Sequence, residues 1–389
     1  MLEICDNTQC TGCGACVSVC PKDAVSLKEG RLGALCSSID TEKCVDCGLC
    51  AKVCPVTSPV TLNKPRNSYA SYAHSSQERT TSSSGGAAAV LTNHMIKKGG
   101  VVYGCAMDRG MKIGHKRIGN LAEASLLKGS KYVYGPINTV LPQIRQDMKE
   151  GRMVLFIGLP CQVAAVINAV GEAENLITMD MCCHGAPSQT LLNEHLAYLG
   201  WPNSEKVEFR KKLPSGIEYA FTLYDRRGKC TYSHRAQKDY YMTGFLNGLF
   251  MRESCFNCQF ARPERCADIT LADHWAMGMS EDPEMVISKG ISTVLVNTEK
   301  GARLFSLAQS LLVYEERPMT EALRNGQFIA PTSKPEEYDQ FVQYYNKEGY
   351  AKACDKYLPA LQRKMRVHKI KSRYYKSPIR QFIRKLLKK

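Results

Sequence analysis

The chain has 389 residues, 19 of them cysteine, and a formal net charge of +15. This length suffices for two or three domains with a sizeable core, and the sequence shows neither a basic-then-apolar leader nor an apolar run of the roughly 18–20 residues that span a bilayer. We therefore expect no secreted disulfide scaffold and no membrane-spanning protein, but a cytoplasmic metal or redox protein.

Two copies of one cysteine pattern occupy the N-terminal region. Cys-x2-Cys-x2-Cys-x3-Cys-Pro runs from Cys10 to Pro21 and again, 34 residues later, from Cys44 to Pro55. Bacterial ferredoxins with two 4Fe–4S clusters have this pattern, and the fourth cysteine of each run binds the other cluster. We assign one cluster to Cys10, Cys13, Cys16 and Cys54, and the other to Cys20, Cys44, Cys47 and Cys50. The alternatives are zinc sites or disulfides, but zinc sites usually pair two Cys-x2-Cys knuckles.

Two further cysteines, Cys5 and Cys36, fall outside the repeat, and we interpret them as small buried residues. The module is expected to end at residue 62. Residues 63–68 include a Lys-Pro pair and are predicted to be a linker.

Beyond the linker, predicted strands alternate with predicted helices. A buried strand at 152–158 precedes an Ala- and Val-rich helix, and a strand at 175–180 precedes an amphipathic helix that follows Ser188. This alternation predicts a mixed, mainly parallel α/β sheet. Cys161 and Cys183 directly follow the two strands, at the carboxyl edge where such sheets bind ligands.

A second pair of cysteines, Cys255 and Cys258, follows a helix predicted at 240–252. Two cysteines cannot close a four-thiolate site, so we expect Cys161, Cys183, Cys255 and Cys258 together to hold a third 4Fe–4S cluster. Zinc, a dithiol pair and unrelated buried cysteines remain alternatives. Cys182 and Cys266 are the replacements if one ligand is misassigned.

Alternating residues at 206–210, 219–224 and 229–234 predict three strands, with a hairpin turn at 225–228.

Six motifs in one order make the chain similar to a known family. They are Ser83-Ser-Gly-Gly86, Gly129-Ser-Lys-Tyr132, Gly158-Leu-Pro-Cys-Gln162, Cys183-His-Gly-Ala-Pro-Ser188, Cys255-x2-Cys258 and Ala267-Asp-Ile-Thr-Leu-Ala-Asp-His-Trp275. Together they resemble the coenzyme F420 hydrogenase/dehydrogenase beta-subunit family over residues 69–325. A ferredoxin module is a common N-terminal partner in that family.

The resemblance implies an iron–sulfur flavoprotein that binds FAD. Relatives exchange electrons between clusters and a deazaflavin or reduce other substrates, and some bacterial members accompany surface-polysaccharide synthesis. It also supports the third cysteine quartet. The chain departs from the family at Ala272-Asp-His-Trp-Ala276, where relatives often have Gly-Asp-Phe-Trp-Gly, so His274 places a titratable ring where they have an inert one.

The cofactor-binding residues that we predict are Ser83, Ser84, Gly85, Gly86, Lys131, Tyr132 and Gln162. The Ser/Gly loop opens a helix at 87–95, and the free N–H groups of a helix N-terminus suit the FAD pyrophosphate, although a plain helix cap would look alike. Lys131 could instead be a solvated surface lysine. His184, Asp273 and His274 are the candidate proton donors, and a structural histidine is the alternative for the two rings.

The C-terminus carries most of the positive charge. Residues 362–389 hold twelve Lys and Arg and no Asp or Glu, and subtracting them leaves +3 for the rest. Ile379, Phe382, Ile383, Leu386 and Leu387 recur at helical spacing, which predicts a basic amphipathic helix. We expect it to dock on the inner face of the membrane, with an acidic partner or the chain's own body as the alternatives. We expect no nucleic-acid partner, because no nucleic-acid-binding fold accompanies it.

These features predict α+β and α/β folds in four segments: a two-cluster ferredoxin domain (1–62), a linker (63–68), an FAD and iron–sulfur domain (69–330) and a helical C-terminal extension (331–389). The expected function is that of an oxidoreductase that passes electrons between 4Fe–4S clusters and FAD to a two-electron acceptor, which is a deazaflavin coenzyme or another substrate such as one of surface-polysaccharide metabolism. Its expected redox partner is ferredoxin or a deazaflavin. The alternative is a non-catalytic electron-transfer subunit of a larger complex.

Overall fold

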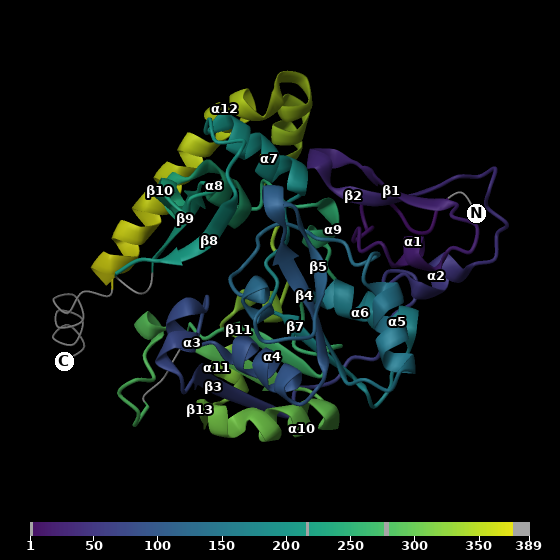
Figure 1. Cartoon of the computed structure of the whole chain (residues 1–389). Coiled ribbons are helices and arrows are strands. Elements are labelled where there is room, and N and C mark those ends of the chain that lie inside the picture. The colour runs from purple at the N-terminus through teal and green to yellow at the C-terminus, as the bar shows by residue number, and fades with distance from the viewer. Residues whose placement is uncertain (1–2, 215–217, 276–279, 376–389) are drawn as a thin grey trace, which may run out of the picture.

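The computed structural model describes residues 3–214, 218–275 and 280–375. Figure 1 shows three parts: a small N-terminal module on one side, a large central sheet with its helices, and a lobe above the sheet that ends in a long helix. The lobe is formed by residues 189–256 and 338–375, so the chain enters it before the last strands of the central sheet are formed.

The N-terminal module is a pair of short helices and a two-stranded antiparallel sheet. Its elements are α1 (Ala15–Val19), β1 (Val25–Glu29), β2 (Leu35–Ile39) and α2 (Leu49–Val53). Gly14 and Gly48 precede the two helices with φ of 81° and 73°, a conformation that costs glycine little. Each helix begins at the third residue of a Cys-x2-Cys segment, which is Cys13–Cys16 for α1 and Cys47–Cys50 for α2.

The central sheet has eight strands in the order β13-β3-β12-β11-β7-β6-β4-β5. They are β3 (Asn67–Ala73), β4 (Val101–Met107), β5 (Ile113–Ile118), β6 (Val154–Gly158), β7 (Leu176–Met181), β11 (Ile269–Asp273), β12 (Ser292–Val296) and β13 (Leu312–Glu316). The four inner strands β11, β7, β6 and β4 pair in parallel, whereas the pairs at both flanks are antiparallel. The predicted mixed α/β sheet is confirmed, but only three of its seven neighbouring pairs are parallel.

Helices cover both faces of this sheet. The helices are α3 (Ser76–Thr81), α4 (Ala87–Lys97), α5 (Leu141–Lys149), α6 (Pro160–Val170), α10 (Glu299–Ala308) and α11 (Met319–Ala322). Leu91 of α4 and Phe305 of α10 share one buried cluster with strand residues such as Leu155. Val163 of α6 and Ile144 of α5 belong to another. Burying an apolar side chain of this size stabilises the fold by roughly 1.5–3 kcal/mol, so these clusters fix the sheet between its helices.

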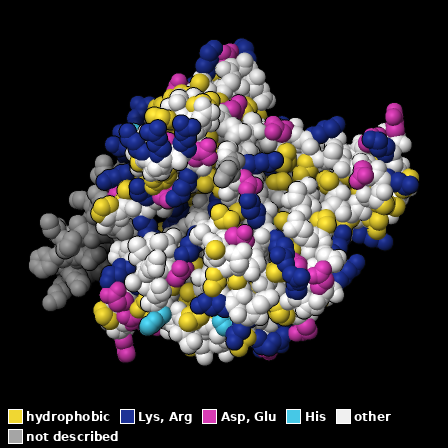
Figure 2. Space-filling view, in the orientation of Figure 1, with side chains coloured by type: hydrophobic (Ala, Val, Ile, Leu, Met, Phe, Trp, Pro, Cys, Tyr) yellow, Lys and Arg dark blue, Asp and Glu magenta, His cyan; other side chains and the backbone are white. Residues whose placement is uncertain are grey.

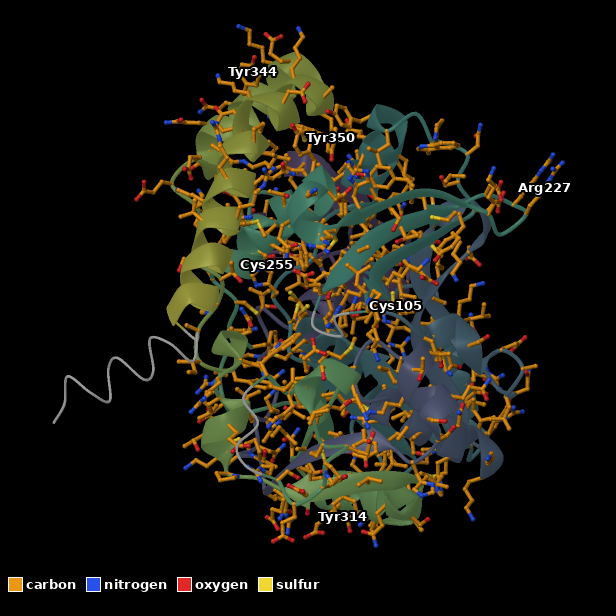
Figure 3. All side chains as sticks on the ribbon, turned by 90° about the vertical axis from the view of Figure 1, so that its left-hand side faces the viewer. Cys105, Arg227, Cys255, Tyr314, Tyr344 and Tyr350 are labelled. Carbon is orange, nitrogen blue, oxygen red and sulfur yellow. The ribbon has the colours of Figure 1, made fainter. Side chains whose placement is uncertain are left out.

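The upper lobe is built on a second, antiparallel sheet. Its elements are α7 (Gln189–Tyr198), β8 (Lys206–Lys212), β9 (Tyr219–Tyr224), β10 (Cys230–Arg235), α8 (Tyr240–Leu246), α9 (Glu253–Phe256) and α12 (Tyr338–Tyr375), which breaks at Gly349. The three predicted strands are confirmed, whereas the helix predicted at 240–252 ends at Leu246. Figure 3 shows the hairpin between β9 and β10 projecting with Arg227 at its tip.

The N-terminal module packs directly on the body. The Ile137 N–H donates to the Cys13 carbonyl (2.8 Å), and the Asn168 side chain donates to the Ser58 carbonyl (2.7 Å). Ala15 and Val53 belong to the same buried cluster as Phe156 of the central sheet. This shared core brings the predicted cluster ligands of the module close to the carboxyl end of β6.

The predicted linker is short and partly ordered into the body. Asn63 forms an isolated antiparallel bridge with Arg265, and β3 already begins at Asn67. Asn67 and Ser68 already pair with β12 as part of β3, and the Arg66 N–H donates to the Val296 carbonyl (2.7 Å).

Within the described residues, every helix is too short or too polar to traverse a lipid bilayer. The basic amphipathic helix predicted around residues 379–387 lies outside the described residues.

Candidate functional site

The first predicted ligand set of the module is gathered in one place. Cys10, Cys13, Cys16 and Cys54 are all buried. Burial raises the pKa of Cys16, and the charges of Cys13, Cys10 and Cys54 raise it further. Burial also raises the pKa of Cys13 to about 11, with Cys54 and Cys10 again among its charged neighbours. The fourth cysteine of the second run has therefore crossed to the first, as a two-cluster ferredoxin requires.

Two cysteines outside the repeat adjoin this set. The pKa of Cys5 is raised mainly by a hydrogen bond with Cys10 and next by a hydrogen bond with Cys54. Cys36 also bonds to Cys10, and this bond raises the pKa of Cys36. Cys5 is buried, as the sequence predicts. Cys36 is only half-buried, so the prediction of a buried residue is wrong for Cys36. Sequence spacing gave no signal of this proximity.

The second predicted set lines a single hollow at the outer end of the module. Cys20, Cys44, Cys47 and Cys50 are all among the residues around a space of about 360 Å³. Cys47 is exposed, and the apolar side chains of Val45 and Leu49 beside it are exposed as well. This hollow therefore lies at the surface, whereas the first set lies deeper.

The third predicted set comes from three separate segments of the body. Cys161 is in the first turn of α6, Cys183 follows β7, Cys255 is in α9 and Cys258 follows it. Burial raises the pKa of Cys161, and the charges of Cys258, Cys183, Cys13 and Cys255 raise it further. Burial raises the pKa of Cys183 as well, with Cys255 and Cys258 as its nearest charges.

The donor set of this third site fits an iron–sulfur cluster. All four thiols are desolvated, and all four cysteines are half-buried. Across the described ranges, no three His, Cys, Asp or Glu side chains are close enough to hold one metal ion. Four thiolates are the donor set of a 4Fe–4S cluster, and zinc also accepts four thiolates.

The two replacement cysteines have other contacts, although Cys266 belongs to the buried cluster against which Cys161 and Cys258 pack. The Cys182 side chain packs beside Ala322 and Phe328, and the Cys266 thiol donates to the Pro160 carbonyl (3.5 Å). Neither is among the charged neighbours that raise the pKa of Cys161. The geometry therefore favours Cys183 over Cys182 in the proposed set.

A second open pocket, of about 400 Å³, lies between the central sheet and the upper lobe. Its lining residues are Ser83, Ser84, Arg210, Lys212, Glu218, Tyr219, Asp273, His274, Trp275, Ile287, Gly290 and Ile291. The Ser/Gly loop and the Asp-His-Trp segment, about 190 residues apart in the sequence, thus face the same space. Sequence analysis missed Arg210, Lys212 and Tyr219, although Arg210 and Lys212 alternate on one face of β8.

The Ser/Gly loop is held by hydrogen bonds within the protein. Ser83 Oγ accepts from the Ser130 N–H (2.9 Å), Ser84 Oγ donates to the Ile291 carbonyl (2.6 Å), and the Gly85 N–H donates to Ser292 Oγ (3.1 Å). Gly86 opens α4 with φ of 94°, which only glycine adopts readily. The loop is therefore rigid, and its helix N-terminus lies beside the pocket.

The remaining predicted cofactor residues are spread around the pocket and behind it. Lys131 Nζ donates to the carbonyls of Leu126 (3.0 Å) and Lys128 (2.9 Å), and burial lowers its pKa to about 8. Tyr132 stacks on Phe245 with ring centroids 4.5 Å apart. These two residues adjoin the pocket through the bond between Ser130 and Ser83.

Gln162 has a structural role. Its Oε1 accepts from the Leu159 N–H (2.8 Å), and its Nε2 donates to the Gly135 carbonyl (2.8 Å). The side chain caps α6 and is buried, so it is occupied away from the pocket.

The three candidate proton donors differ in their surroundings. Asp273 lines the pocket and forms an ion pair with Arg210 (2.7 Å). The His274 ring is buried, with Nδ1 beside Thr293 Oγ1 (2.9 Å) and Nε2 beside Glu321 Oε2 (3.2 Å), and burial lowers its pKa. Both ring nitrogens have partners, an arrangement typical of a structural histidine.

His184 lies beside the third thiol set and away from the pocket. Its Nδ1 faces Gln327 and Thr332 (both 3.2 Å), whereas its buried Nε2 finds no partner in the described part of the chain. The ring lies edge-on to Phe245 (5.2 Å), which in turn stacks on Tyr132. His184, Phe245 and Tyr132 thus form a packed row from Cys183 toward the pocket.

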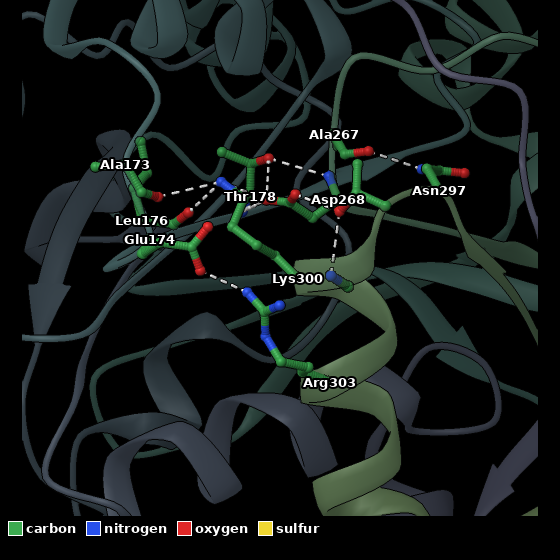
Figure 4. Close-up of polar contacts among 11 residues, drawn as sticks. Ala173, Glu174, Leu176, Thr178, Ala267, Asp268, Asn297, Lys300 and Arg303 are labelled. Atoms are coloured by element: carbon green, nitrogen blue, oxygen red, sulfur yellow. Dashed lines mark hydrogen bonds and ion pairs between the residues drawn. The ribbon is translucent and has the colours of Figure 1, made fainter.

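The Ala267-Asp-Ile-Thr motif serves the fold. Asp268 accepts from the Thr178 N–H (2.8 Å), from Thr178 Oγ1 (3.0 Å) and from Thr298 Oγ1 (2.5 Å), with Lys300 3.8 Å away (Figure 4). These bonds join β7, β11 and the start of α10.

Comparisons with known proteins agree with the two-part organisation. Residues 9–58 match a 4Fe–4S dicluster domain, and residues 151–322 match the C terminus of the coenzyme F420 hydrogenase/dehydrogenase beta subunit. A chain of the F420-reducing [NiFe] hydrogenase complex from Methanosarcina barkeri is 18% identical over 74% of this chain and 93% of that chain, with a TM-score of 0.47. No curated protein matches the sequence significantly.

Proposed function

We propose that the chain is an iron–sulfur flavoprotein oxidoreductase, because residues 151–322 match the C terminus of the coenzyme F420 hydrogenase/dehydrogenase beta subunit and follow a region that matches a 4Fe–4S dicluster domain. Electrons would pass from the two N-terminal clusters through a third cluster to FAD and leave in pairs. The observation that carries this proposal is the presence of three thiol quartets, one of them exposed at the surface and another joined toward the open pocket by the packed rings of His184, Phe245 and Tyr132.

The residues proposed for each group have suitable chemistry. Cys161, Cys183, Cys255 and Cys258 would hold the third cluster, and Arg210, Lys212 and the Ser/Gly loop would hold the phosphates and ring of FAD. FAD, when bound, supplies the exchange between single electrons and electron pairs. Trp275, which is 44% exposed, and Tyr219 offer aromatic faces beside the Arg210 guanidinium (5.9 Å and 5.0 Å to the ring centroids).

Asp273 fixes the position of Arg210, and this ion pair orients the guanidinium toward the pocket. His184 remains the better candidate for holding a proton near the third quartet, because its Nε2 is free within the described chain whereas both nitrogens of His274 are engaged. The electron donor would meet the exposed Cys47 end of the module, where Val45 and Leu49 provide an apolar contact for a partner such as ferredoxin.

The acceptor is proposed as a two-electron carrier or substrate. A deazaflavin fits the family's name, and a substrate of surface-polysaccharide metabolism is the other candidate. Mixing the isolated chain with reduced ferredoxin and each acceptor distinguishes an oxidoreductase from the alternative, a non-catalytic electron-transfer subunit, because only the former turns over alone.

Purification without oxygen, followed by cofactor analysis, tests the proposal. We expect about twelve irons and twelve sulfides per chain and one FAD released on denaturation. About eight irons would remove the third cluster. A preparation that releases no flavin would refute the oxidoreductase proposal and favour the alternative, a non-catalytic electron-transfer subunit.

We further propose that residues 362–389 hold the protein on the inner face of the membrane. Lys and Arg side chains gather on the surface over β8–β10 and the neighbouring part of α12 (Figure 2), next to the segment that carries the basic tail. Each basic side chain near an anionic leaflet contributes up to about 1 kcal/mol. Flotation with vesicles that contain phosphatidylserine should fail for a chain that ends at residue 361. Equal flotation of both chains would refute the membrane contact.

A further inference from the structure

One buried arginine lies between the module and the third thiol set. Arg252 is 6% exposed and immediately precedes α9. Its guanidinium donates to the Thr11 carbonyl, inside the Cys10-x2-Cys13 loop, and to the Leu35 carbonyl (3.5 Å). Its own carbonyl accepts from the Cys255 N–H (3.1 Å). Arg252 therefore contacts the backbone of both candidate cluster sites.

The ring beneath this guanidinium lies between the same two sites. Arg252 lies 4.0 Å from the ring centroid of Tyr134. Burial raises the pKa of Tyr134, and its nearest charged groups are Cys161 and Cys13. The thiols of Cys161 and Cys13 are themselves close enough for the charge of one to raise the pKa of the other. The first and third quartets thus meet at Tyr134 and Arg252.

The backbone of the module is shaped to admit Arg252. Gly12 has φ of +67°, and a Cβ added there would lie 2.5 Å from Arg252 Nη1 and 2.3 Å from the Leu35 carbonyl oxygen. A side chain at residue 12 would be strained and would displace the guanidinium.

The positive charge of Arg252 faces uncharged groups in the module. Guanidinium groups stay protonated in proteins, and the contacts of Arg252 with the module are to neutral carbonyls. Its Nε is buried without a hydrogen-bond partner in the part of the chain that the structure describes. Burial raises the pKa of Cys255, and the Arg252 charge opposes that rise, so this cation acts on the third site as well as on the first.

We propose that Arg252 is a positioning residue for electron transfer between the cluster of Cys10, Cys13, Cys16 and Cys54 and the cluster of Cys161, Cys183, Cys255 and Cys258. The inference rests on the proposed function. One electron leaves the first cluster and enters the third, no bond forms or breaks, and Arg252 keeps its proton. Its cation favours the more negative, reduced form of both clusters, and its bonds to Thr11 and Leu35 hold them side by side.

The test is a redox titration of the full-length, anaerobically prepared protein, followed by electron paramagnetic resonance. In Arg252→Gln the equilibrium constants for reduction of the first and third clusters should each fall about tenfold. A unit charge exerts an effect of this order at roughly 10 Å through protein with an effective dielectric constant of about 20. The cluster of Cys20, Cys44, Cys47 and Cys50 should keep its potential, and Arg252→Lys should stay within about threefold of the wild type.

A matched control comes from the same loop. Arg262 pairs with Glu264 (2.9 Å) and is half-exposed, so Arg262→Gln should leave all three potentials unchanged. Unchanged potentials in Arg252→Gln, or an equal shift of all three clusters, would overturn the proposal.

If the wild type itself lacks the third cluster, the proposed function fails, whatever the role of Arg252. The number of irons per chain distinguishes that case from a failure of the Arg252 proposal. If Arg252→Gln loses iron, Arg252→Met, which keeps the length without the charge, replaces it in the titration. Should both neutral variants lose iron while Arg252→Lys keeps all three clusters at shifted potentials, the charge role is refuted.

Discussion

Replacing Asp268 by alanine tests whether the Ala267-Asp-Ile-Thr motif serves the fold or the chemistry. The carboxylate is 4% exposed and accepts three hydrogen bonds, two from Thr178 and one from Thr298. Each bond to a charged acceptor contributes about 1.5–3 kcal/mol, and water that enters the vacated site satisfies some of the donors. We therefore expect Asp268→Ala to lower the free energy of unfolding of the body by about 3–5 kcal/mol.

The assay is urea unfolding followed by circular dichroism, and Glu174→Ala is the control. Glu174 pairs with Arg303 (2.6 Å) in the same region of Figure 4, but both side chains are exposed (86% and 57%). This pair should contribute no more than about 1 kcal/mol. The structural role of Asp268 would be refuted if Asp268→Ala unfolded at the same urea concentration as Glu174→Ala while losing cofactor.

Three other predictions concern the candidate sites. Cys183→Ser should lose about four irons per chain in a colorimetric iron analysis, whereas Cys182→Ser should keep them. The reverse result would show that Cys182, and not Cys183, is the ligand. Arg210→Gln should weaken FAD retention about tenfold or more in equilibrium dialysis, whereas Arg227→Gln, at the exposed tip of the hairpin between β9 and β10, should not. Equal retention by the two variants would remove Arg210 from the flavin site. Burial holds the pKa of Lys131 at about 8, below the value of about 10.4 for a free lysine. Between these two pH values the native chain binds fewer protons than the unfolded chain. The free energy of unfolding should therefore increase as the pH rises from about 8 to 10.4. Thermal unfolding of the cofactor-free protein measures this gain, which Lys131→Met should abolish; an unchanged pH dependence would contradict it.

The parts of the structure that could be predicted are those that depend on the spacing of residues close together in the sequence. Each four-cysteine run spans a few residues, so its pattern alone assigns the two N-terminal sets, and residues 9–58 match a dicluster domain. Cys161 and Cys183 each follow a buried strand, and parallel strands bring their carboxyl ends to one edge. The sequence could therefore place these two thiols together without any knowledge of the tertiary structure.

The features that depend on distant partners could not be predicted in this way. His274 follows a strand like a pocket residue, but Thr293 and Glu321, from later segments, engage both of its nitrogens. Gln162 sits in a family motif, yet its amide caps its own helix. The antiparallel flanks of the central sheet were missed because the strand pattern of β12 and β13 does not reveal their neighbours.

The pocket shows the same limit. Arg210 and Lys212 belong to the second sheet, and only the packing of the upper lobe brings them opposite Ser83 and Asp273. No spacing in the sequence connects these segments. Arg252 is a similar case, since its contact with the Cys10-x2-Cys13 loop joins residues 241 positions apart.

The most direct test of the account is an anaerobic reductive titration that counts electrons per chain. Three clusters that take one electron each and an FAD that takes two predict an uptake of about five electrons, with bleaching of flavin absorbance near 450 nm in the same titration. An uptake of about two electrons without any flavin signal would contradict it, because the N-terminal module would then account for all of the redox capacity.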